Sequence, residues 1–267
     1  MTPRVIGRAV STRADVAPLD DAAIERYSRQ LILAGVGEAG QARLAAARVL
    51  VVGAGALGAP VIHYLAAAGT GELEVWDRDR VELSNLARQP VHGEADLGSN
   101  KAESACASAR AINGTVRAVP VSRRLEEADM AATVTGRTVV CDATDDLETK
   151  FALNDACVAT GVPLVHAAIL EFGGQLTAVV PGRPCLRCLF GSPPPPGSVP
   201  GCAQAGILGP VAAVVGGMQA VEAMKLILQV GAPLAGSMLV YDALGPRTRR
   251  VQFKRDPDCA GPHPDRE

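Results

Sequence analysis

Aromatic residues are scarce in this chain of 267 residues, since one Trp, three Tyr and four Phe make up only 3% of it. Hydrophobic residues still amount to 48%. A core must therefore be built mainly from Ala, Val, Leu and Ile, which suits helices packed closely on a sheet. The length is sufficient for one large α/β domain or two small ones.

A surplus of either charge is also missing, because 26 Lys and Arg face 28 Asp and Glu, for a net charge of −2. Proteins whose main partner is nucleic acid usually carry a basic surface. We therefore do not expect nucleic acid to be the main partner.

No secretion signal is recognisable, because the polar residues 1–20 contain no apolar segment. We expect residues 1–20 to be a flexible extension and the protein to be cytoplasmic. The apolar residues 207–229 include Pro210, Glu222 and Lys225, which favours a buried helix over a membrane span. The seven cysteines are then expected to be metal ligands, catalytic thiols or core residues, not disulfides.

Strand and helix patterns alternate along the chain. The strand patterns lie at 48–53, 71–77, 115–121, 138–144 and 163–169, and the helical patterns at 22–35, 58–69, 99–114, 125–136 and 147–161. Asp21 and Ser99 are candidate caps for two of these helices. Such alternation predicts a parallel, doubly wound sheet.

The pattern changes after residue 173. Alternating polar and apolar residues predict antiparallel strands at 174–180, 237–243 and 248–253. The fold class is therefore α/β: a single domain with a Rossmann-like, mostly parallel sheet and antiparallel C-terminal strands. We place this domain at 21–254, with a proline-rich crossover loop at 189–206 and a C-terminal tail at 255–267.

A glycine-rich turn in the stretch RVLVVGAGALG follows the first predicted strand. Gly53, Gly55 and Gly58 have the spacing of a strand–turn–helix phosphate site. Asp77 ends the second predicted strand, where an acid accepts hydrogen bonds from ribose hydroxyls. These residues fit a dehydrogenase, a flavoprotein and an ATP-using enzyme equally well.

Charged residues at the same predicted sheet edge separate these possibilities. Asn85, Arg88 and Gln89 follow the second strand, Lys101 begins the next helix, and Asp145 follows the fourth strand. Clustered cations suit a triphosphate under attack better than a nicotinamide, and a carboxylate beside phosphates is typical of a Mg²⁺ site. The set favours nucleotidyl transfer over hydride transfer.

Several motifs in the order RYSRQ, GAGALG, SNLARQ, DATDD, C-x-x-C and CAQAGILGP resemble the ThiF/MoeB/HesA family of bacterial E1-like enzymes. The resemblance covers residues 22–260. It implies an enzyme that uses ATP and Mg²⁺ to adenylate the C-terminal Gly-Gly of a ubiquitin-like sulfur carrier, with release of pyrophosphate. It also implies a homodimer and a separate sulfur donor, either a sulfurtransferase or a cysteine desulfurase.

The resemblance assigns roles by position. The implied nucleotide-binding residues are Gly53, Gly55, Ala56, Gly58, Asp77, Ser84, Asn85, Arg88, Lys101, Asp145 and Asp146. Asp145 would hold Mg²⁺, and Asp146 stands where the family usually has Asn. Arg29, from RYSRQ, would reach the triphosphate of the neighbouring subunit.

Cys185 and Cys188 form a C-x-x-C, which is half of a zinc site. The family closes this site with a second C-x-x-C, of which Cys259 matches the first member, whereas Pro262 occupies the second position. His263 follows, so we expect a Cys₃His zinc site. A three-ligand site and free thiols are the alternatives.

Cys202 aligns with the crossover-loop cysteine of the family, and the sequence leaves open whether it is catalytic or without function. The catalytic candidates are Arg29, Arg88, Lys101, Asp145 and Cys202. Four other functions remain: an E1-like enzyme acting on a peptide C-terminus, a tRNA-modifying relative, an NAD-dependent oxidoreductase, and a silent adaptor.

Overall fold

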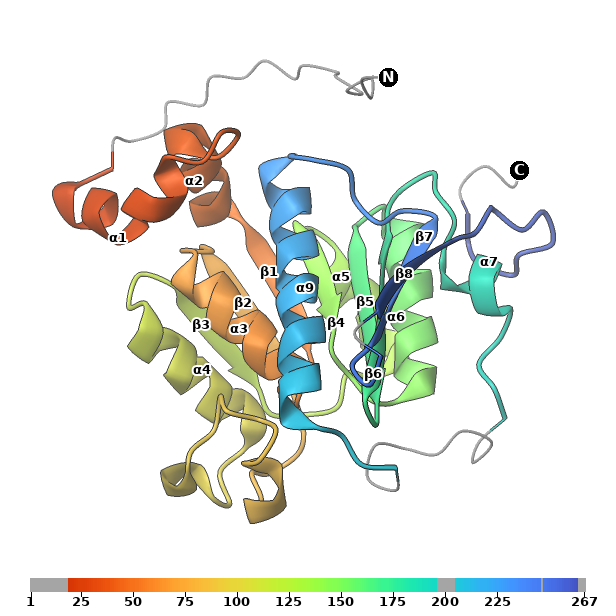
Figure 1. Ribbon diagram of the computed structural model, residues 1–267, viewed down its shortest axis with the longest axis horizontal. Helices are drawn as coiled ribbons and strands as arrows, with labels where there is room; N and C mark the ends of the chain where they lie inside the picture. The colour runs from red at the N-terminus through yellow and green to blue at the C-terminus, as the bar shows by residue number, and fades with distance from the viewer. Residues whose placement is uncertain (1–18, 196–204, 246, 264–267) are drawn as a thin grey trace.

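The computed structural model describes residues 19–195, 205–245 and 247–263. One mixed sheet of eight strands in the order β3-β2-β1-β4-β5-β6-β7-β8 runs through the molecule, with helices on both faces (Figure 1). The predicted fold class is confirmed: the first five strands are parallel and the last three are antiparallel.

The strands form the sheet in two halves. The parallel half consists of β1 Arg48–Val52, β2 Glu72–Trp76, β3 Arg117–Val121, β4 Val139–Asp142 and β5 Leu164–Leu170. The antiparallel half consists of β6 Gly173–Val179, β7 Ser237–Asp242 and β8 Arg247–Gln252.

The helices cover the sheet unequally. Their bounds are α1 Asp21–Leu31, α2 Gly37–Ala46, α3 Gly58–Ala67, α4 Lys101–Ile112, α5 Glu127–Val134, α6 Leu147–Thr160, α7 Leu186–Phe190 and α9 Gly209–Leu228, with short 3₁₀ turns η1 Leu83–Asn85 and η2 Glu94–Asp96. The sequence patterns did not predict α2 or α7. The helices α3, α4 and α9 cover one face, and α5 and α6 cover the other.

The central strand β1 contributes to both cores. Val49 and Val51 belong to the hydrophobic cluster under α3, α4 and α9, whereas Leu50 and Val52 belong to the cluster under α5 and α6. A parallel strand that is buried on both faces needs apolar residues at successive positions, which explains the sequence RVLVV.

Two predicted helix caps are wrong by one residue. Asp20 caps α1, since its Oδ1 accepts from Ala23 N at 2.7 Å, and Asp21 is already helical. Asn100 caps α4 by accepting from the backbone amides of the first turn, and Ser99 precedes it. When two neighbouring residues can both cap a helix, the sequence does not show which of them does so. The backbone conformation at the start of the helix decides which side chain reaches the free amides.

The helix α9 lies in the middle of one face, packed on β5, β6 and α3. Within the described part of the chain it is the one helix that is long and apolar enough to cross a membrane. However, 56% of its most apolar stretch is buried inside the fold. This burial is typical of a core helix, as the sequence predicted.

The carboxyl edge of the parallel strands carries the glycine-rich turn, which joins β1 to α3. A Cβ on Gly58 would lie 2.0 Å from the carbonyl oxygen of Gly53. The first turn of α3 therefore packs so closely on the preceding turn that only glycine fits at residue 58.

Gly58→Ala is expected to lower the free energy of unfolding by about 2 kcal/mol, because the methyl group must displace backbone. Chemical denaturation measures this change. Gly114→Ala is the control, because the nearest atom to its new Cβ lies 4.0 Å away. Equal stabilities of the two variants would contradict the close approach.

Candidate functional site

A cleft of about 950 Å³ opens at the carboxyl edge of the sheet. Most of the predicted nucleotide-binding residues line it, namely Gly53, Gly55, Ala56, Asp77, Asn85, Arg88, Lys101, Asp145 and Asp146. Gly58 and Ser84 are not part of the lining. Gly58 instead permits the tight turn, and the backbone oxygen of Ser84 accepts a hydrogen bond from Arg88 Nη1 at 2.7 Å.

The glycine turn is held in place by the backbone at Ala143 and by the side chain of Asp77. Gly53 has φ of 100°, and a Cβ there would lie 2.6 Å from the carbonyl oxygen of Ala143. Asp77 accepts through Oδ2 from Ala54 N at 2.8 Å and through Oδ1 from Asp79 N at 2.8 Å. Burial raises the pKa of Asp77. Asp77 thus shapes the turn, while its position in the cleft wall remains suited to a ribose.

His92, to which the sequence analysis gave no chemistry, supports the same turn. Its Nε2 lies 3.0 Å from the carbonyl oxygen of Ala54 and its Nδ1 lies 2.8 Å from Ser104 Oγ. Because a carbonyl only accepts, Nε2 carries the proton and Nδ1 accepts from the hydroxyl. Burial lowers the pKa of His92, which favours this neutral form.

Seven cationic side chains line the cleft, beside five carboxylates. The cations are Arg78, Arg80, Arg88, Lys101, Arg123, Arg124 and Lys150. Lys101 is nearly buried, with its side chain 10% exposed, and its Nζ lies 3.2 Å from Asp79 Oδ2. Asp79 is 57% exposed, so an anionic ligand can compete with it for the lysine. Sequence reasoning did not identify Asp79, Arg123, Arg124 or Lys150.

The two aspartates after β4 differ in their surroundings. Asp146 caps α6 by accepting from Thr149 N at 3.0 Å, and it pairs with Arg124 at 3.2 Å. Asp145 is exposed and has no hydrogen-bond or ion-pair partner within the described ranges. Asp145 is therefore the carboxylate available to a cation in the cleft.

Gln89, from the SNLARQ motif, also lines the cleft. Its side chain is buried, and its Oε1 has no hydrogen-bond partner among the described residues. A buried amide oxygen without a donor is costly, so Gln89 Oε1 is a candidate acceptor for a ligand.

Arg29 is exposed on α1 and does not line the cleft of its own chain. On the same helix, Gln30 Nε2 donates to the carbonyl oxygen of Ala68 at 3.0 Å. Ala68 ends α3 at the amino edge of the sheet, opposite to the cleft (Figure 1). Arg29 therefore cannot serve the cleft of its own chain in this arrangement.

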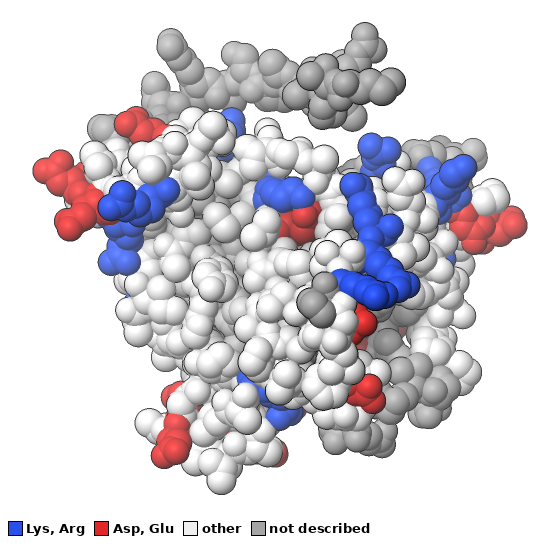
Figure 2. All heavy atoms as spheres, in the orientation of Figure 1, with Lys and Arg blue, Asp and Glu red and all other residues white. Residues whose placement is uncertain are grey.

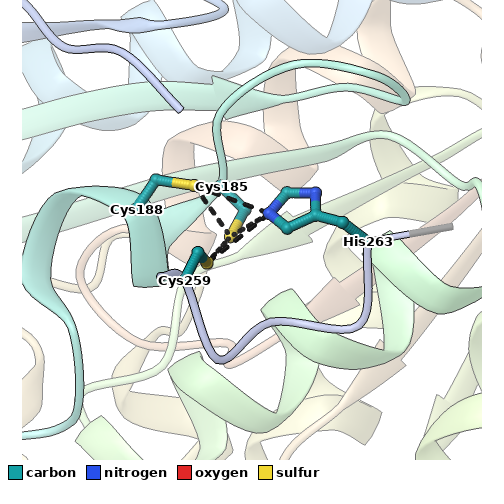
Figure 3. Close-up of side chains that lie close together, drawn as sticks. All are labelled: Cys185, Cys188, Cys259 and His263. Atoms are coloured by element: carbon teal, nitrogen blue, oxygen red, sulfur yellow. Dashed lines mark hydrogen bonds between the residues drawn. The ribbon is translucent and has the colours of Figure 1, made fainter. Parts of the chain in front are cut away.

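The four predicted metal ligands come together, as Figure 3 shows. Cys185 Sγ lies 3.8 Å from Cys188 Sγ, 3.7 Å from Cys259 Sγ and 3.3 Å from His263 Nε2. Tetrahedral zinc with ordinary bond lengths requires separations of about 3.8 Å between two sulfurs and about 3.6 Å between sulfur and nitrogen. The donor set and the distances fit zinc.

The remaining cysteines fall into two groups. Cys106, Cys141 and Cys157 are buried free thiols, and burial raises the pKa of Cys106 and of Cys141 to about 12. They pack in the core, as expected. Cys202 lies outside the described residues.

Comparisons with known proteins agree with this geometry. A family model described as the ThiF family matches residues 27–261. The SAMP-activating enzyme E1 of Haloferax volcanii is 50% identical over 241 residues, which cover 90% of this chain and 89% of that protein. The sulfur carrier protein adenylyltransferase of Thermus thermophilus is 46% identical over 242 residues, with 88% and 89% covered.

A third relative is longer than this chain. The adenylyltransferase and sulfurtransferase MOCS3 of Mus musculus is 50% identical over 238 residues, which cover 88% of this chain but only 52% of that protein. The chain thus spans about half of MOCS3.

Solved structures show the same fold. Escherichia coli MccB with MccA-N7isoASN superposes with a TM-score of 0.79 at 22% identity, over 89% of this chain and 74% of that one. PaaA gives a TM-score of 0.75 at 21% identity, over 94% and 78%. Since the family model spans most of the chain and relatives of high identity match nearly all of it, the chain belongs to the ThiF family.

Proposed function

We propose that the protein is an ATP-dependent adenylyltransferase, which activates the C-terminal Gly-Gly carboxylate of a ubiquitin-like sulfur carrier as an acyl-adenylate. The observation that carries the proposal is the cleft in which Arg88 and Lys101 lie beside the glycine turn and the unpaired Asp145. The names of the two relatives that match along nearly their whole length support it.

The cleft has a second, less polar part that suits the tail of the carrier. Ile169 and Leu170 of β5, Gly173 and Gly174 of β6, and Tyr241 of β7 line it. A tail that ends in Gly-Gly has no side chains there, so it can lie extended against these strands. The carrier itself then sits outside the cleft, against the antiparallel half of the sheet.

In this mechanism the tail carboxylate attacks the α-phosphorus of ATP, the bond to the β-phosphate oxygen breaks, and pyrophosphate leaves. Arg88 and Lys101 stabilise the charge that develops on the phosphates. The rest of the lining holds both substrates in line. Bound Mg²⁺ would supply Lewis-acid stabilisation of the phosphates, and Asp145 would hold it.

The sulfur is then delivered by a separate protein, a sulfurtransferase or a cysteine desulfurase, in the cytoplasm. The catalytic role of Cys202 stays a prediction. An NAD-dependent oxidoreductase is less consistent with the cleft, because its lining is rich in cations beside the glycine turn.

ATP–pyrophosphate exchange with a Gly-Gly-ending carrier tests the proposal. We expect Arg88→Ala to slow the exchange by about a hundredfold or more, because one donor to the transition state is lost. Arg110→Ala is the control, since Arg110 lies on α4 and donates to the backbone of β3. Exchange close to the unsubstituted rate in Arg88→Ala would remove Arg88 from the mechanism, and binding of NAD in place of ATP would refute the proposed activity.

The cysteine cluster is proposed to hold one structural zinc ion. Cys185 and Cys188 flank the start of α7, whereas Cys259 and His263 come from the C-terminal tail. The ion would therefore tie the tail to the antiparallel half of the sheet. The cluster lies outside the residues that line the cleft, so we assign it no part in adenylation.

Protein purified without added metal should contain one zinc ion per chain by elemental analysis. We expect His263→Ala to lower this content and the thermal midpoint, because it leaves three ligands. Cys106→Ala, which removes a buried cysteine outside the cluster, should leave the zinc content and the thermal midpoint unchanged. Full zinc content in His263→Ala would show that the fourth ligand lies elsewhere.

A homodimer is proposed from the exposed apolar side chains over α3 and α9. Tyr64 on α3 is 60% exposed, and Val214 and Val221 on α9 are 41% and 56% exposed. Figure 2 shows a largely uncharged area over these two helices. Exposed apolar side chains on two neighbouring helices suit an interaction site, and the partner we propose is a second copy, whose Arg29 completes the cleft.

Mixing Arg29→Ala chains with Arg88→Ala chains tests this arrangement. Each variant alone should be inactive, while exchange of subunits should restore activity, because one cleft in a mixed dimer then has both arginines. Mixed dimers that form but remain inactive would show that Arg29 does not act across the interface.

A further inference from the structure

Three ionisable side chains lie together at the base of the cleft, and the mechanism above gives none of them an individual role. Asp142 ends β4, Lys150 lies on α6, and His166 lies on β5, with exposed fractions of 0%, 4% and 3%. Lys150 also contributes to the cleft lining. A buried charge is costly unless it is paired and hydrogen-bonded, so this cluster needs an explanation.

The carboxylate of Asp142 is the centre of the cluster. Its Oδ1 accepts from Thr144 N and from Lys150 Nζ, both at 3.2 Å. Its Oδ2 accepts from Lys150 Nζ at 3.2 Å and from His166 Nδ1 at 2.6 Å. Burial opposes ionisation, yet Lys150 and His166 hold the pKa of Asp142 below its ordinary value.

Lys150 and His166 are already engaged by the protein. Besides Asp142, the ammonium group of Lys150 donates to the carbonyl oxygen of Ala167 at 2.9 Å. Burial lowers the pKa of His166, which favours a neutral ring that donates through Nδ1. The cluster is therefore not arranged to bind or protonate a substrate, and its effect must pass through the backbone it holds.

That backbone is the segment between β4 and α6, which includes Asp145. The Asp142 carboxylate holds the amide of Thr144. Ala143 N donates to the carbonyl oxygen of Val52 at 2.9 Å, and the Ala143 carbonyl oxygen lies against Gly53. At the far end, Asp146 caps α6. The segment is thus fixed on both sides of Asp145 and is pressed against the glycine turn.

A purely structural role would not require charges here. Replacing a buried ion pair by well-packed apolar residues is often neutral or stabilising, whereas a satisfied polar network fixes one geometry. This network holds the segment between β4 and α6, which carries the unpaired carboxylate of Asp145. Its position therefore indicates that the network fixes the place of Asp145 in the cleft.

We propose that Asp142, Lys150 and His166 are positioning residues, which fix the Thr144–Asp145 backbone against the glycine turn so that Asp145 can hold the Mg²⁺ of bound ATP. The inference rests on the proposed function, because it requires ATP with Mg²⁺ in this cleft. It adds that Mg²⁺-dependent nucleotide affinity depends on Asp142 and His166, which do not line the cleft, and on the bonds that Lys150 makes to Asp142.

Calorimetric titration of ATP, with Mg²⁺ and separately with EDTA, tests the inference without a carrier. We expect His166→Leu to weaken binding of ATP with Mg²⁺ by about 10-fold, the scale on which residues behind a metal ligand act. Binding in EDTA should change much less. His166→Asn should restore the Mg²⁺-dependent affinity, because its amide can replace the Nδ1 donor. His63→Leu, on α3 and outside the cleft lining, is the control.

Equal affinities of His166→Leu and the unsubstituted protein for ATP with Mg²⁺ would overturn the inference. A loss of the same size with Mg²⁺ and with EDTA would also overturn it. If thermal melting shows that His166→Leu does not fold, the same titrations are made with His166→Gln, whose amide lies one bond farther from the backbone than that of Asn. Weaker binding with Mg²⁺ but not with EDTA supports the inference, and unchanged affinity overturns it.

The unsubstituted protein separates this inference from the proposed function. ATP binding that does not depend on Mg²⁺ overturns the inference alone. Failure to bind ATP under either condition refutes the proposed function, and the inference with it.

Discussion

The close approach of two backbone segments determines the rest of the site. The glycine turn after β1 and the segment after β4 meet at Gly53 and Ala143, where a side chain at Gly53 would lie 2.6 Å from a carbonyl oxygen. Because β1 and β4 are neighbours in the sheet, both segments leave the same edge in parallel. The glycine turn and the carboxylate of Asp145 are thereby brought to one cleft.

The charged side chains of the cleft differ in how firmly the protein holds them. The cations of the cleft lie beside carboxylates that are tied to backbone, such as Asp77 on Ala54 N and Asp146 on Thr149 N. Lys101 instead faces Asp79, whose side chain is 57% exposed although that of Lys101 is only 10% exposed. In the proposed function a bound triphosphate would compete with Asp79 for Lys101, while the carboxylates that shape the turn stay in place.

Sequence patterns predicted the sheet and the glycine turn, because each depends on local spacing or on one strand edge. The four clustered ligands, Cys185, Cys188, Cys259 and His263, were predicted from the C-x-x-C spacing together with the family resemblance. The contacts of His92, Lys150 and His166 could not be predicted in this way. Each joins segments that are distant in the chain, and a lone buried histidine reads as ordinary core. Asp146 shows the same limit, since its pairing with Arg124 needs the loop after β3 to be placed first.

The cysteine cluster joins the C-terminal tail to the body of the fold. The antiparallel half of the sheet ends at β8, whose residues are all exposed, so this last strand contributes no buried side chain. Cys185 and Cys259 are buried beside Leu186, and Leu186 N donates to Asn154 Oδ1 on α6 at 2.8 Å. The cluster thus links the tail to α7 and α6, which also begins beside the cleft at Asp146. The zinc ion proposed above would tie the tail to these helices without placing any of its ligands in the cleft.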